Sequence, residues 1–173
     1  MKKLISFFQK PYTGRLGRLQ YFIGFPIGFI SIIVGIALTT AVKSVFAVSE
    51  GNVIVIIVGV VFLVLSFLLL FFSVFVTWSL SVRRWHDLGC SGWTFLLNAI
   101  PIVGELLIVI LFFIPSKEEV NEYGKQLKSN NIFSILFNKK TDQPFSPSEK
   151  YLPMVAFIGS LLVFLWFFLI HLR

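Results

Sequence analysis

Four long apolar blocks, separated by shorter polar stretches, dominate the chain. They cover roughly Tyr21 to Val42, Asn52 to Val82, Gly92 to Ile114 and Leu152 to Leu172. About 20 apolar residues are enough for a helix to cross a bilayer, and residues 51–82 contain no charged side chain. Because such a run is too long and too apolar for the surface helix of a soluble domain, the pattern predicts a helical membrane protein.

We therefore predict an all-α, polytopic integral membrane protein with four hydrophobic helical segments. Only helices and closed barrels satisfy their backbone groups in lipid, and the unbroken blocks lack the alternating polarity of barrel strands. The third block, residues 92–114, leaves two alternatives open. Its length allows it to cross as one helix, whereas Pro101 and Gly104 favour a kinked or re-entrant segment that returns to the side it came from.

The charge distribution predicts an orientation. The net charge is +7, and the basic residues gather at the ends of the apolar blocks, as expected for membrane orientation rather than nucleic-acid binding. Five Lys or Arg residues precede the first block and Arg83-Arg84 follows the second, whereas only Lys43 lies between them. This bias predicts a cytoplasmic N-terminus. The excess of Lys and Arg on one side of the membrane stays large if the third block returns to the side it came from. It nearly vanishes if the block crosses the membrane.

A basic motif precedes the first block. Arg15 and Arg18 lie three residues apart, so on a helix they project from one face. Such a pair could hold a lipid phosphate through forked hydrogen bonds, or could simply orient the chain. Further on, the short apolar run Ile132 to Phe137 is too short to span, and we expect either an interfacial helix or an anchored loop there.

A second, richer motif runs from Arg83 to Trp93. Asp87 can pair with either preceding arginine on one helix face. Gly89 is expected to end the second helix, and Ser91 to cap the third. His86 can change its charge near neutral pH, so the motif predicts a polar cluster at the membrane surface as well as a turn.

Catalysis is not expected from this set of residues. Two His and one Cys do not provide the ligands of a metal site, and no phosphate-binding Gly-rich loop is present, so we predict no metal and no cofactor. Glu105 lies deep in the third block, where an acid predicts either a structural hydrogen bond or the proton-linked group of a small transporter or channel component. A membrane enzyme acting on lipids through His86 and Asp87 is the remaining alternative.

The polar motifs taken together resemble those of a known family. They are Gly14-Arg15-x-x-Arg18-x-x-Tyr21, Arg83-Arg84-x-His86-Asp87-x-Gly89-x-Ser91-Gly92-Trp93, Pro101 to Gly104, and Asn121-Glu122-Tyr123-Gly124. In this order they resemble the domain of unknown function 805 family, the YhaH-like small bacterial inner-membrane proteins, over roughly residues 10–125. The resemblance implies a bacterial inner (plasma) membrane location and brings no established activity.

The resemblance also divides the chain and groups the candidate residues. It implies a basic cytoplasmic segment at 1–20, a membrane domain at 21–126, a polar or interfacial linker at 127–150 and an additional C-terminal transmembrane helix at 151–173. It implies one cytoplasmic-side cluster, made of Arg15, Arg18, Arg83, Arg84, His86, Asp87, Asn121 and Tyr123, to which we add Ser91 as a binding candidate. Asn121 and Tyr123 can join this cluster only if the third block returns.

The function expected from these features is non-enzymatic. A basic cytoplasmic face would bind anionic lipid headgroups, since each Lys or Arg near an anionic surface contributes about 1 kcal/mol, or would bind a protein partner. That partner would be a second copy of the chain or another membrane protein. No nucleic-acid partner is expected.

Overall fold

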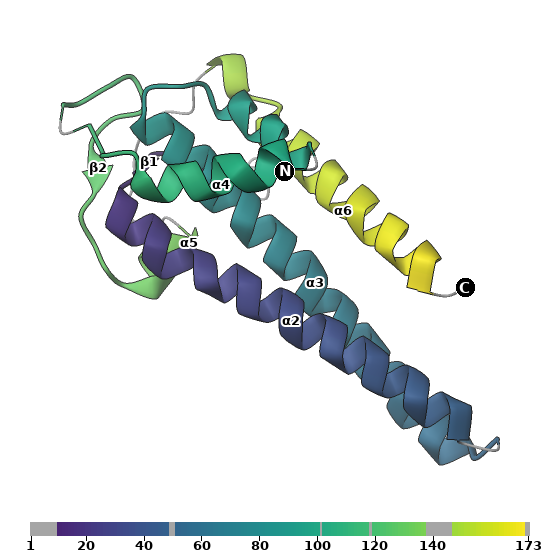
Figure 1. Ribbon diagram of the computed structural model, residues 1–173. Coiled ribbons are helices and arrows are strands. Elements are labelled where there is room, and N and C mark those ends of the chain that lie inside the picture. The colour runs from purple at the N-terminus through teal and green to yellow at the C-terminus, as the bar shows by residue number, and fades with distance from the viewer. Residues whose placement is uncertain (1–9, 49–50, 101, 118, 138–146, 172–173) are drawn as a thin grey trace.

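The computed structural model describes residues 10–48, 51–100, 102–117, 119–137 and 147–171. Two long helices, α2 and α3, lie side by side, and shorter elements gather at one of their ends (Figure 1). Part of the predicted basic segment, with Lys2 and Lys3, lies outside the described residues, as does Pro101.

The described elements are mostly helical. In chain order they are η1 (Lys10–Tyr12), β1 (Arg15–Leu16), α2 (Arg18–Val48), α3 (Val53–Asp87), η2 (Gly92–Ala99), α4 (Val103–Phe113), β2 (Gln126–Leu127), α5 (Ile132–Phe137), η3 (Pro147–Glu149) and α6 (Leu152–His171). The all-α prediction missed one feature, a parallel pairing of β1 with β2 in which Arg15 lies opposite Gln126. Strands of two residues leave no periodic pattern in the sequence.

Helices α2 and α3 are the two that are long and apolar enough to cross a membrane among the described residues. Their bounds exceed the predicted blocks, because Arg18 begins α2 and α3 continues through Arg83 and Arg84 to Asp87. Asn52 caps α3 by accepting a hydrogen bond from the N–H of Ile54 at 3.0 Å. The apolar stretches of α4 and of α6, the latter over residues 152–163, are shorter.

Buried hydroxyl groups along α2 and α3 are satisfied within their own helices. Thr39 donates to the carbonyl of Gly35 at 2.8 Å, Ser66 to Phe62 at 2.8 Å and Ser73 to Leu70 at 2.9 Å. Small residues of this kind let two helices approach closely without leaving an unpaired polar group. The long hairpin can therefore pack tightly even where water is excluded.

The third apolar block is divided into two helices. Ile102, with a φ of 68°, separates η2 from α4, and α4 packs back against η2. Only glycine fits at position 104, because a Cβ there would lie 2.2 Å from the carbonyl oxygen of Asn98. The alternative of one uninterrupted helix over residues 92–114 is therefore wrong, and each of the two helices is shorter than the span of about 20 residues that a bilayer requires.

The well-buried core lies at the end of the hairpin where the short elements gather. It includes Leu16, Leu80, Phe95 and Ile135, none of them more than 1% exposed. The run predicted as an interfacial helix or a loop forms the helix α5, which packs against α2 and α3 through Ile135. Helix α6 packs against α3, with the rings of Phe71 and Phe157 5.6 Å apart.

Candidate functional site

Charged side chains are buried inside the short-element end of the hairpin. The last turn of α3 supplies Arg84, His86 and Asp87, and none of the three is more than 1% exposed. The polar cluster, as we define it, consists of Arg15, Arg84, His86, Asp87, Asn121, Tyr123 and Glu149. Buried charges at this density are stable only when each finds a partner.

Asp87 is the centre of the polar cluster. Its Oδ1 accepts hydrogen bonds from Nε and Nη2 of Arg15, at 3.1 and 3.0 Å, and from Nε2 of Gln126 at 3.2 Å. Its Oδ2 accepts from Nη1 of Arg84, one turn back on α3. One of the two pairs predicted from helix spacing, Arg84 with Asp87, is thus formed, and the other arginine of α3 points elsewhere.

The remaining donors of the two arginines hold the last turn of α4 and the loop that follows it. Arg15 also donates to the carbonyl oxygens of residues 117, 119 and 124, the last at 3.2 Å. Arg84 Nε donates to the carbonyl of Leu111 at 3.1 Å, and its Nη1 donates to Ser116 Oγ at 3.1 Å. Both guanidinium groups are buried and bound to acceptors of the chain itself, so they do not form the exposed basic face expected from the sequence.

His86 connects the cluster to β1 and to the segment before α6. Its Nδ1 lies 3.1 Å from the carbonyl oxygen of Gly14, and its Nε2 lies 2.9 Å from Oε2 of Glu149. Its ring stacks on Tyr123, with the centroids 3.9 Å apart and the planes 3° from parallel. Asn121 Nδ2 donates to the backbone carbonyl of His86 at 2.7 Å. The stacking and the contacts of the two ring nitrogens fix the plane of the imidazole, and Asn121 holds the backbone of the same residue.

Glu149 is the second buried carboxylate, and sequence reasoning missed it. Its Oε1 accepts from Gly92 N at 2.6 Å, Ser91 Oγ at 3.0 Å and the hydroxyl of Tyr123 at 3.2 Å. Burial alone would raise the pKa of Glu149, but His86 and these donors outweigh it and the pKa is lowered. Burial, and then the charge of Glu149, raise the pKa of Tyr123, so at neutral pH a carboxylate accepts a bond from a neutral phenol.

The turn between α3 and η2 has the structure that its residues predict. Gly89, with a φ of 79°, follows the end of α3, and its N–H donates to the carbonyl of His86 at 3.1 Å. Ser91 caps η2 by accepting a hydrogen bond from the N–H of Trp93. The predictions of a helix end at Gly89 and a cap at Ser91 are confirmed. This turn places Ser91 and Gly92 where both reach Glu149.

The structure brings together seven of the residues singled out in the sequence and leaves three apart. Arg15, Arg84, His86, Asp87, Ser91, Asn121 and Tyr123 gather around the two carboxylates. Arg83 is buried but donates toward α5. Arg18 has an exposed side chain at the start of α2, and Glu105 has an exposed side chain in the first turn of α4.

The polar cluster joins distant segments of the chain and does not pair His86 with Asp87. Among the residues that the structure describes, no group of three or more His, Cys, Asp and Glu could hold a metal ion. His86 and Asp87 are bound by different partners, as expected for neighbours on a helix. The contacts instead join β1, the loop after α4 and the segment before α6 to the end of α3.

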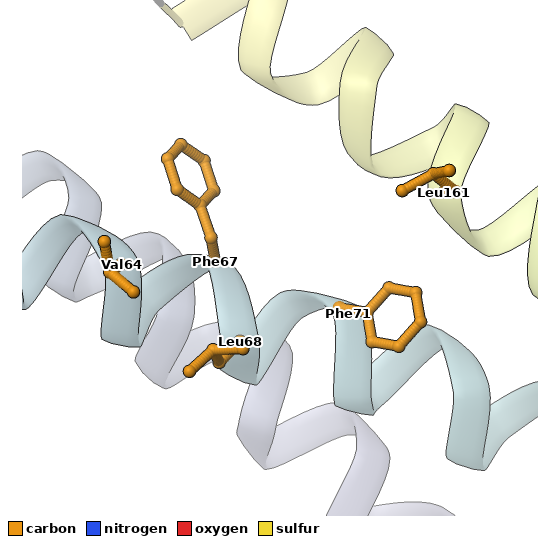
Figure 2. Close-up of a pocket in the computed structure, with 5 residues that line it drawn as sticks. All are labelled: Val64, Phe67, Leu68, Phe71 and Leu161. Atoms are coloured by element: carbon orange, nitrogen blue, oxygen red, sulfur yellow. The ribbon is translucent and has the colours of Figure 1, made fainter.

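Among the residues that the structure describes, two grooves outside the polar cluster are of interest. One, of about 660 Å³, lies between α2 and α4 and is lined by Arg18, Leu19, Phe22, Val109, Phe112 and Phe113. The other, of about 370 Å³, lies between α3 and α6, and its five lining side chains are all apolar (Figure 2). The α3–α6 groove therefore offers no side-chain charge or hydrogen bond to a ligand, whereas the α2–α4 groove has one cation beside an apolar wall.

Comparison with known proteins gives a family match. The model of the family described as "Protein of unknown function (DUF805)" matches residues 11–125, which is more than half of the chain. This stretch contains every member of the polar cluster except Glu149. Neither the curated proteins nor the solved structures include a significant match. On the strength of the family match, the chain belongs to the DUF805 family of proteins of unknown function.

Proposed function

We propose that the chain is a non-enzymatic, multi-pass protein of a bacterial inner membrane that binds an anionic phospholipid in the groove between α2 and α4. The observation that carries this proposal is the pairing of an apolar wall with one free cation. Phe22 and Phe113 are 63% and 74% exposed along the groove. Among the described residues, the guanidinium of Arg18 has no hydrogen-bond or ion-pair partner.

The groove fits a molecule that has both a phosphate group and an acyl chain. Arg forms forked hydrogen bonds to phosphate oxygens, and an apolar wall buries acyl chain at roughly 0.8 kcal/mol per CH₂ group. Arg18 begins α2, whose apolar length follows directly. A phospholipid in the same leaflet would thus place its phosphate beside Arg18 and its chain along Phe22 and Phe113.

The membrane placement that this proposal needs has its own support. Helices α2 and α3 are long and apolar enough to span a membrane, and we propose that α6 crosses as well. We propose that η2 and α4 enter and return on the cytoplasmic side, because α4 packs back on η2 and the loop after α4 is bound to the end of α3 by Arg15 and Arg84. This orientation follows from the excess of Lys and Arg residues on the side of the membrane where the N-terminus lies.

Retention of lipid by the purified protein tests the binding proposal. In an uncharged detergent, native mass spectrometry should show phosphatidylglycerol retained in preference to phosphatidylcholine. Arg18→Gln should weaken retention about fivefold, since one basic residue near an anionic surface is worth about 1 kcal/mol. Lys43→Gln is the matched control, because Lys43 is also exposed on α2 but lies toward its other end. Equal retention by wild type and Arg18→Gln would contradict the proposal.

A further inference from the structure

Arg83 is a buried arginine whose hydrogen bonds are incomplete. It lies on α3 where that helix meets η1 and α5, and its side chain is 0% exposed. Nη1 donates to the backbone carbonyl of Ile135 in α5. Nε and Nη2 are buried as well, and within the described part of the chain neither has a hydrogen-bond partner.

The charge of Arg83 is also uncompensated. Arg15 and Arg84 are equally buried, yet both reach the carboxylate of Asp87. The described end of the hairpin buries three guanidinium groups, those of Arg15, Arg83 and Arg84, but only the carboxylates of Asp87 and Glu149. A buried charge without a partner is costly, and in folded proteins such charges are paired. The local excess of positive charge favours an anion at Arg83.

The free atoms define which anion fits. Nε and Nη2 form one edge of the guanidinium and point two N–H groups in parallel, the geometry that binds two oxygens of one oxyanion. The bond from Nη1 to Ile135 helps to fix the plane of the group, and within the described residues it leaves that buried edge without an acceptor. Arg83 lies one turn before the end of α3. In the proposed membrane placement, Arg83 lies at the depth of the lipid phosphate groups, so phosphate is the oxyanion available to it.

We infer that Arg83 anchors a site for a phosphate group, which it binds through the Nε–Nη2 edge. The phosphate can belong to a lipid headgroup or be free inorganic phosphate, because both present the same pair of oxygens. The site is separate from the α2–α4 groove. It depends on the buried edge of Arg83 and not on Arg18, so either site can fail without the other.

Thermal unfolding of the full chain in phosphate-free, uncharged detergent tests the inference. We expect inorganic phosphate, short-chain phosphatidic acid, or both, to raise Tm in a saturable way at constant ionic strength, and the arm that responds identifies the source. Arg83→Lys keeps the charge but loses the fork, so it should weaken the apparent affinity about tenfold or more. The phosphatidic acid titrations are made in the Arg18→Gln background, which removes the cation of the α2–α4 groove, and Lys43→Gln should leave the response unchanged.

Three results would overturn the inference. One is a wild-type Tm that neither probe raises, which would mean that water alone satisfies the edge. Another is a response of equal size in Arg83→Lys. If that variant does not fold, ¹⁵N spectra of arginine-labelled wild type decide: the Arg83 Nε–H resonance should shift and exchange more slowly on titration with the responding probe. An unchanged resonance would equally contradict the site.

Discussion

Asp87→Asn tests whether the buried charges hold the fold together. The change keeps the size of the side chain but removes the one carboxylate that Arg15 and Arg84 share. Oδ1 and Oδ2 of Asp87 each accept a hydrogen bond from a guanidinium group. In asparagine one of these positions becomes an NH₂ group, which faces a donor, and the other becomes an uncharged oxygen. Two buried cations then lose their counter-ion.

The size of the effect follows from the burial. Breaking a buried ion pair by removing one partner costs about 3–5 kcal/mol, because the other charge stays desolvated. Arg15 and Arg84 keep their carbonyl acceptors in Asp87→Asn, so we expect a loss within that range and not beyond it. For a chain of this length, 1 kcal/mol shifts Tm by about 2–4 °C. The expected fall in Tm is therefore on the order of 10 °C.

Thermal unfolding in mild detergent, followed by intrinsic Trp fluorescence, measures this fall. Glu119→Gln is the matched control, because it removes the same charge from an exposed side chain of the same region and should change stability by no more than about 0.5 kcal/mol. In the Asp87→Asn background, Arg84→Gln should cost less than it costs in wild type. A Tm for Asp87→Asn within about 2 °C of the control would refute the structural role of the cluster.

Further predictions concern Glu149, Tyr123 and Gly104. Because the pKa of Glu149 is lowered in the folded chain, its contribution to stability is present above about pH 4.5 and is lost as the pH falls below that value; Glu149→Gln should flatten the acid limb of a Tm–pH profile. Tyr123→Phe keeps the stacking on His86 and loses the bond to Glu149, so it should cost about 1 kcal/mol in the same unfolding assay, and Tyr123→Leu should cost more. Gly104→Leu should separate η2 from α4 and lower Tm by several degrees, whereas Val103→Leu should not.

The long helices could be predicted because their cause is local. A run without charge, such as residues 51–82, specifies a helix in lipid whatever surrounds it. The roles of Gly89 after a helix end and of Ser91 as a cap could also be predicted, since a helix end and a cap depend on one or two residues. The Arg84–Asp87 pair followed from helix spacing alone.

The burial of Arg15 and Arg84 could not be predicted from local sequence. In the sequence, Arg15 and Arg84 look like surface charges. Only the fold shows that both donate hydrogen bonds to the loop after α4, which lies about 100 residues from Arg15 and about 30 residues from Arg84 along the chain. Glu149 belongs to no motif and lies beyond the matched family region, so nothing local marks it as a partner of His86. Its one sequence signal is an acid that lies shortly before the apolar block beginning at Leu152.

The central claim is that the α2–α3 hairpin crosses the membrane and that η2 and α4 return to the side of the polar cluster. Single cysteines at Val53, which begins α3, and at the exposed Lys128, in a Cys90→Ser background, test both parts with an impermeant thiol reagent on spheroplasts. The account predicts labelling of Val53→Cys from outside and of Lys128→Cys only after the membrane is opened. Labelling of both positions from the same side would contradict it.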